Sequence, residues 1–184
     1  MDSILEAATR LFDRGAATTN GIAKLAGVSI GSLYEYFPNK DAIVGRLFEA
    51  HVDEAIETLS ATVSRTPPEQ TPLADGLRPM VEALLDLHTV RPGLHRVFLA
   101  KLAALPAVRS RVAEAELRLR AVVEAWMAGH PEVAVPDLTL AARIVVEGSN
   151  ALVHGYIADD EGVPQEAFVD EVTRLWTGFL RGAS

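Results

Sequence analysis

Apolar residues recur at the spacing of an α-helix along most of this 184-residue chain. The first such pattern comprises Ile4, Leu5, Ala8, Leu11 and Phe12, which would share one face of a helix. No segment of useful length alternates apolar and polar residues, and no Asn-Gly turn joins two such segments into a hairpin. The sequence therefore predicts an all-α fold of about nine helices.

Glycines, prolines and capping residues divide the predicted helices. Gly15 follows the first pattern, where a left-handed cap would end it, and Asn39 is placed to cap the long helix that comes after residues 18–37. Prolines between residues 67 and 72 break the chain. Pro92 suits the first turn of a helix, and Pro106 opens another long helical pattern. Two further helices are expected, over Leu138–Ala158 and around residues 168–179.

Composition excludes several classes of protein. The chain has no cysteine, so a disulfide framework, a Cys-ligated zinc ion and a thiol nucleophile are all excluded. No apolar run approaches the roughly 18 residues of a membrane span, and the acidic start does not resemble a signal peptide. We therefore expect a soluble, cytoplasmic protein with no membrane contact. The net charge of −8 argues against a protein coated in nucleic acid, but it permits a small DNA-binding face.

Residues 18–37 have the pattern of a helix-turn-helix motif. Thr18, Thr19 and Asn20 offer capping groups for a short helix over residues 21–26. Residues 27–29 form a tight turn that contains glycine, and Ser29 can cap a second short helix, Ile30–Tyr36. The second helix would begin with short side chains, and a helix of this kind enters the major groove of DNA at its N-terminus.

The polar groups around the second helix suit DNA contacts. Ile30 could meet a thymine methyl group, and Ser32 could bond to base edges. Tyr34, Tyr36 and Lys40 add hydroxyl groups and a cation, which commonly contact phosphates. The pattern alone leaves a second interpretation open, because short helices with small-residue turns also occur in bundles that bind no DNA. Charge does not separate the two, since residues 1–50 carry five basic and six acidic side chains.

The run IAKLAGVSIGSLYEYFPNKDAI resembles the N-terminal domain of TetR-family transcriptional regulators. The resemblance covers about the first 50 residues and implies an N-terminal three-helix DNA-binding domain over residues 1–50, followed by a larger helical effector-binding and dimerisation domain over residues 51–184. It implies base contacts at the start of the second short helix and at Tyr36, and phosphate contacts around them. The complete predicted DNA-binding set is Thr18, Thr19, Asn20, Ser29, Ile30, Gly31, Ser32, Tyr34, Tyr36 and Lys40.

Two features depart from the family pattern. The loop over residues 15–22 is about two residues shorter than usual, so either its turn is tighter or residues are missing from it. Glu35 occupies a position that the family often fills with a basic or aromatic residue. A carboxylate there would repel phosphate, so it either points away from DNA or helps to reject particular bases.

The rest of the chain would bind a small molecule and form a homodimer through its last two helices, as the resemblance implies. Small residues over Leu138–Ala158 permit close approach of helices, and Phe168, Leu175, Trp176 and Phe179 offer a second apolar face. Two such helices from each of two chains would form a four-helix bundle about a two-fold axis. Alternatively, both faces are buried within one monomer.

Candidate ligand-binding residues are polar or aromatic groups among apolar helical residues, since small-molecule sites combine an apolar wall with a few polar groups. Asn150 is the strongest candidate, because a buried amide requires a hydrogen-bond partner. Each candidate could instead be an ordinary core or surface residue. The predicted set is His88, His95, Phe98, Trp126, Asn150 and His154.

No pattern supports an enzyme, a metal site or a cofactor. The five histidines show no metal-binding spacing on a helix, and the sequence contains no glycine-rich phosphate loop or nucleophile elbow. The sequence therefore predicts a ligand-responsive transcriptional regulator, specifically a repressor that a small molecule releases from a palindromic DNA operator. The alternative is a helical ligand-binding or protein-interaction dimer whose DNA-binding unit is degenerate.

Overall fold

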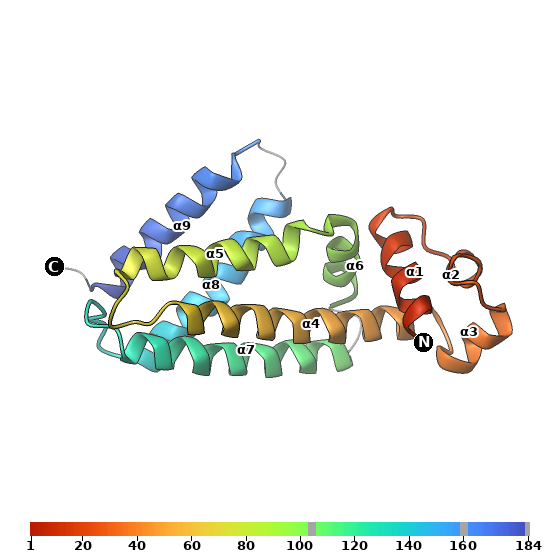
Figure 1. Cartoon of the computed structure of the whole chain (residues 1–184), viewed down its shortest axis with the longest axis horizontal. Coiled ribbons are helices and arrows are strands. Elements are labelled where there is room, and N and C mark those ends of the chain that lie inside the picture. The colour runs from red at the N-terminus through yellow and green to blue at the C-terminus, as the bar shows by residue number, and fades with distance from the viewer. Residues whose placement is uncertain (103–105, 159–161, 183–184) are drawn as a thin grey trace. The chain divides into compact units, whose positions relative to one another are not determined.

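The computed structural model describes residues 1–102, 106–158 and 162–182. Within these ranges the chain forms nine helices and no strand, as predicted (Figure 1). The helix bounds are α1 Asp2–Asp13, α2 Thr19–Ala26, α3 Ile30–Tyr36, α4 Lys40–Arg65, α5 Leu73–Thr89, α6 Pro92–Leu102, α7 Pro106–Ala128, α8 Leu138–Ala158 and α9 Gln165–Leu180.

The chain divides into two compact units, and α6 belongs to the first of them. The first unit contains residues 1–53 and 90–112, and the second contains residues 54–89 and 113–184. In terms of packing, α6 therefore groups with the N-terminal helices, although 55 residues separate it from α3 in the sequence. The domain boundary near residue 50 that the sequence suggests stays a prediction.

The first unit has a core of apolar side chains from α1, α2, α3, α4 and α6. Ile4 and Phe12 of α1 are buried, as are Ile22 of α2 and Leu33 of α3. α1 packs against both α2 and α6, and α2 packs against α3. This arrangement holds the two short helices, which at eight and seven residues would be unstable alone.

The second unit is centred on α5, which packs against both α8 and α9. Its core includes Leu77 and Val81 of α5 together with the two tryptophans, Trp126 of α7 and Trp176 of α9. The Trp126 indole N–H donates a 2.7 Å hydrogen bond to the Thr66 carbonyl oxygen. Every helix of this unit thus contributes to one continuous apolar interior.

Candidate functional site

Local hydrogen bonds fix the turn between α2 and α3. The Thr18 hydroxyl oxygen accepts a 3.1 Å bond from the Gly21 N–H and so caps α2. Gly27 has a φ of +71°, a left-handed conformation that glycine adopts without strain, and it ends α2. The Ser29 hydroxyl oxygen then accepts a 2.9 Å bond from the Ser32 N–H and caps α3. The predicted capping roles of Thr18 and Ser29 are confirmed, and α2 begins two residues earlier than expected, at Thr19.

α3 presents an unusual set of exposed side chains. Leu33 is buried and anchors the helix, whereas Ile30, Tyr34 and Tyr36 are 39%, 48% and 58% exposed. Gly31 lies on the exposed side as well. Scattered single apolar residues are common on surfaces, but two tyrosines and an isoleucine are many large exposed side chains for one seven-residue helix. The helix can therefore approach a partner with its N-terminus and these side chains.

The other predicted DNA-contacting residues surround α3. The hydroxyl oxygens of Thr19 and Tyr34 lie 3.3 Å apart, which joins α2 to α3. The Asn39 side-chain oxygen accepts a 2.9 Å bond from the Ala42 N–H, so Asn39 caps α4 as expected and Lys40 begins that helix with its side chain exposed. Asn20 is exposed, and Ser32 is half-buried with its hydroxyl oxygen 2.9 Å from that of Ser29. Contact of these residues with DNA stays a prediction.

Two exposed residues near this surface were not identified from the sequence as candidates. Leu25 on α2 is 48% exposed, and Lys24 beside it is exposed too. Glu35 is also exposed on α3. Leu25 is flanked by Lys24 and Ala26, so its immediate neighbours in the sequence carry no clear signal of exposure.

The second unit contains a cavity of about 70 Å³. Fifteen residues from α4, α5, α7, α8 and α9 line it, and none of them is charged. Of the six predicted ligand-binding residues only Asn150 is among these fifteen; Trp126 belongs to the core beside the cavity, and Trp176 lines the cavity instead. The remaining candidates lie elsewhere: His88 and His154 in the second unit, and His95 and Phe98 on α6 of the first unit.

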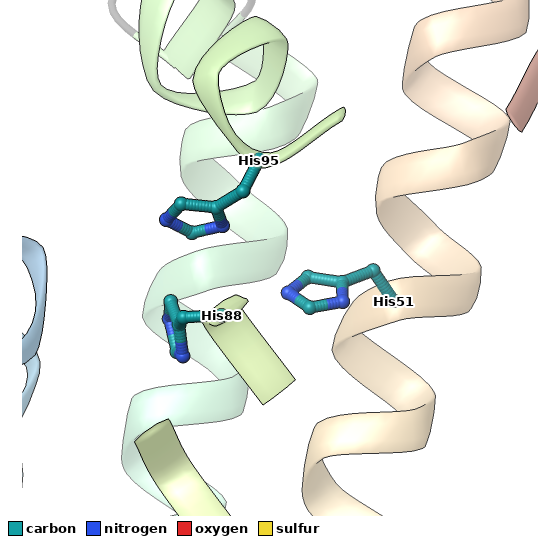
Figure 2. Close-up of side chains that lie close together, drawn as sticks. All are labelled: His51, His88 and His95. Carbon is teal, nitrogen blue, oxygen red and sulfur yellow. The ribbon is translucent and has the colours of Figure 1, made fainter. Parts of the chain in front are cut away.

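Each unit brings together two histidine rings that are far apart in the sequence. In the first unit the rings of His51 and His95 lie 6.2 Å apart between centroids, and Figure 2 shows these side chains on α4 and α6. In the second unit the rings of His88 and His154 lie 5.0 Å apart. His88, which Figure 2 also labels, has its Nδ1 2.7 Å from the Leu84 carbonyl oxygen. Two imidazoles do not complete the four-ligand shell of a zinc site, so neither pair alone defines a metal centre.

Burial lowers the pKa of His154 from its ordinary value of 6.5. Because the folded-state pKa is below that of the unfolded chain, the unfolded chain takes up the proton first as the pH falls. The contribution of His154 to stability is therefore fully present above about pH 6.5 and is lost below it. When the pH is lowered from 7.5 to 5.5, we expect the free energy of unfolding to fall less in the His154→Gln protein than in the native protein. Urea unfolding at the two pH values measures this difference. An equal loss in the two proteins would contradict this assignment.

The outer sides of α8 and α9 carry exposed apolar residues and a shallow groove. Leu140, Ile144 and Leu152 of α8 and Leu175 of α9 are exposed. Phe168 and Phe179 of α9 line the groove together with Leu152 and Leu175. Contiguous exposed apolar residues often mark a protein interface. The predicted second face is only partly exposed, because Leu175 is exposed whereas Trp176 is buried within the unit. Dimerisation through these helices stays a prediction.

None of the helices in the described ranges is both long and apolar enough to cross a membrane.

Family models account for most of the chain. The model described as "Bacterial regulatory proteins, tetR family" matches residues 4–47, and the model described as "Tetracyclin repressor-like, C-terminal domain" matches residues 72–180. Curated relatives include the nucleoid occlusion factors SlmA of Haemophilus influenzae, 32% identical over 80 residues, and of Vibrio cholerae, 31% identical over 100 residues. These matches cover 44% and 52% of this chain, and only 35% and 49% of the two relatives.

Solved structures share the fold over nearly the whole chain. A transcriptional regulator from Rhodococcus sp. Rha1 covers 100% of this chain and 98% of its own, with a TM-score of 0.76 and 19% identity. FadR from Bacillus subtilis in complex with stearoyl-CoA covers 96% and 97%, with a TM-score of 0.68 and 20% identity. Salmonella enterica GusR covers 98% and 95%, with a TM-score of 0.71 and 24% identity.

Proposed function

The chain belongs to the tetR family of bacterial regulatory proteins, and on this premise we propose that it is a repressor that a small molecule releases from a palindromic DNA operator. The observation that carries the proposal is α3, whose N-terminus is capped by Ser29 and whose Ile30, Tyr34 and Tyr36 are exposed. A helix of this kind can place its first turn in the major groove while hydroxyl groups contact the flanking phosphates. A protein that acts on operator DNA works in the bacterial cytoplasm, where that DNA is found.

A homodimer would supply the second recognition helix. The exposed apolar face of α8 and α9 supports an isologous interface, in which the same surface of each chain pairs with its copy. Two α3 helices related by a two-fold axis would read half-sites about 34–36 Å apart.

The cavity of the second unit would bind the effector. The ligand changes operator affinity only if it binds more tightly to a conformation that fits the operator poorly, because coupling requires different affinities for two states. Bacillus subtilis FadR has been crystallised with stearoyl-CoA, and this supports a small-molecule effector for a protein of the same fold.

Tyr36→Ala and Lys40→Ala test the DNA-binding role. We expect each substitution to weaken binding to DNA from upstream of the protein's own gene by about tenfold, since each removes one contact. Lys40→Ala should also reduce the slope of log affinity against log salt concentration by about one, because one counterion fewer is released from the DNA. Fluorescence anisotropy at several salt concentrations measures both effects, and thermal unfolding should stay unchanged because both side chains are exposed.

Arg118→Ala is the matched control, since Arg118 is an exposed cation on α7 in the second unit. It should leave operator binding unchanged. Native binding in the Tyr36 and Lys40 variants would instead favour a helical ligand-binding dimer with a degenerate DNA-binding unit. The exposed carboxylate of Glu35 on α3 is the feature that motivates this second candidate.

A further inference from the structure

The wall of the second unit's cavity is almost entirely hydrocarbon. Leucine, valine and methionine side chains from α4, α5, α7 and α8 form most of it, and no Asp, Glu, Lys, Arg or His is among the lining residues. An ionised carboxylate or phosphate in such a wall would lose its hydration without gaining a cation as partner. The cavity therefore selects against charged ligands.

Three polar groups interrupt the hydrocarbon wall. Ser149 and Asn150 are neighbours on α8, and Trp176 contributes its indole ring from α9. The Trp176 side chain is only 6% exposed, and its buried Nε1–H has no hydrogen-bond acceptor. Asn150 is half-buried, so its amide is not an unsatisfied buried group. Buried polar groups without partners are rare in folded proteins, so the Trp176 N–H calls for an acceptor that the protein does not supply.

We propose, on the basis of the repressor function above, that the effector is an uncharged, mostly hydrocarbon molecule with a single hydroxyl or carbonyl oxygen. The oxygen accepts a hydrogen bond from the Trp176 Nε1–H. The Asn150 amide can donate to a hydroxyl or carbonyl oxygen of the ligand and can accept from a hydroxyl group. The cavity of about 70 Å³ is several times the space that one water molecule needs, which suits a ligand of roughly five to eight non-hydrogen atoms.

The two tryptophans allow a direct test with 1-hexanol, hexanoate and hexylamine as probes of equal chain length and different charge. The Trp126 N–H already donates to the Thr66 carbonyl oxygen, whereas the Trp176 N–H is unpaired. In a two-dimensional ¹H–¹⁵N spectrum of the full chain, 1-hexanol should move the Trp176 indole signal downfield and leave that of Trp126 in place. Trp176→Phe assigns the two signals because it removes one of them.

Affinity measurements complete the test. We expect hexanoate and hexylamine to bind at least about tenfold more weakly than 1-hexanol, and Asn150→Leu to weaken 1-hexanol binding by up to about tenfold. Equal affinity for hexanoate, or an unmoved Trp176 signal at saturating 1-hexanol, would overturn the proposal. Operator binding without any ligand is measured separately, so failure of the repressor function is distinguishable from failure of this ligand assignment.

Discussion

Replacing Gly93 with alanine is expected to destabilise the first unit by about 3 kcal/mol, because the second residue of α6 touches the backbone at the end of α1. A Cβ atom added at Gly93 would lie 1.8 Å from the carbonyl oxygen of Asp13. That oxygen belongs to the backbone, so it cannot move aside as the end of a flexible side chain could. Only glycine permits this approach.

The close contact between Gly93 and Asp13 lets the Asp13 side chain cap the N-terminus of α6. The first N–H groups of a helix have no partners within the helix, and a carboxylate beside them supplies both acceptors and a favourable charge. The Asp13 side-chain oxygen accepts bonds of 3.0 Å from the Gly93 N–H and 3.3 Å from the Leu94 N–H. Gly93→Ala would push Asp13 away and break both bonds as well as the packing of α1 on α6.

Chemical unfolding followed by circular dichroism measures this effect, and Gly45→Ala is the matched control. Gly45 lies on α4 in the same unit, and a Cβ atom there would meet no other atom within 4 Å. Gly45→Ala should therefore stabilise the protein by about 0.5–1 kcal/mol, since alanine favours the helix. A Gly93→Ala protein as stable as the native chain would show that α1 and α6 do not meet as described.

Local patterns in the sequence predicted the helices and the turn geometry well. The bounds of α3, the caps at Ser29 and Asn39 and the position of Pro92 in the first turn of α6 all depend on residues within four positions of one another. Such interactions are encoded by short-range spacing, so a single sequence is enough to identify them.

Contacts between distant segments could not be predicted in the same way. Asp13 and Gly93 are 80 residues apart, and nothing in either segment indicates that they meet. The two tryptophans show the same limit. Trp126 was selected as a ligand candidate because it is aromatic, yet it is Trp176 that lines the cavity. Which buried indole borders an empty space depends on how five helices pack, and helical periodicity carries no information about that.

The second large effect is expected from Leu175→Arg, which should dissociate the proposed homodimer and weaken operator binding by about 100-fold. Leu175 is 51% exposed on α9 and lines the mostly apolar groove beside α8. In an isologous interface each substitution occurs twice, so two added guanidinium groups would be desolvated in a groove that already holds Arg174 and its ion-pair partner Glu171. A monomer then binds one half-site at a time and loses the effective concentration that links the second recognition helix to the first.

Sedimentation at micromolar concentration and anisotropy with operator DNA measure the two consequences in parallel. Leu117→Arg provides the control, because Leu117 is an exposed leucine of α7 in the same unit and lies outside the groove. It should leave both the dimer and operator affinity unchanged. If Leu175→Arg remained dimeric, the interface would lie on another face, and if it became monomeric with native operator affinity, the two recognition helices would act independently. The combination of lost dimer and lost affinity is therefore the specific signature of a repressor that dimerises through α8 and α9 and reads a palindrome with its two α3 helices.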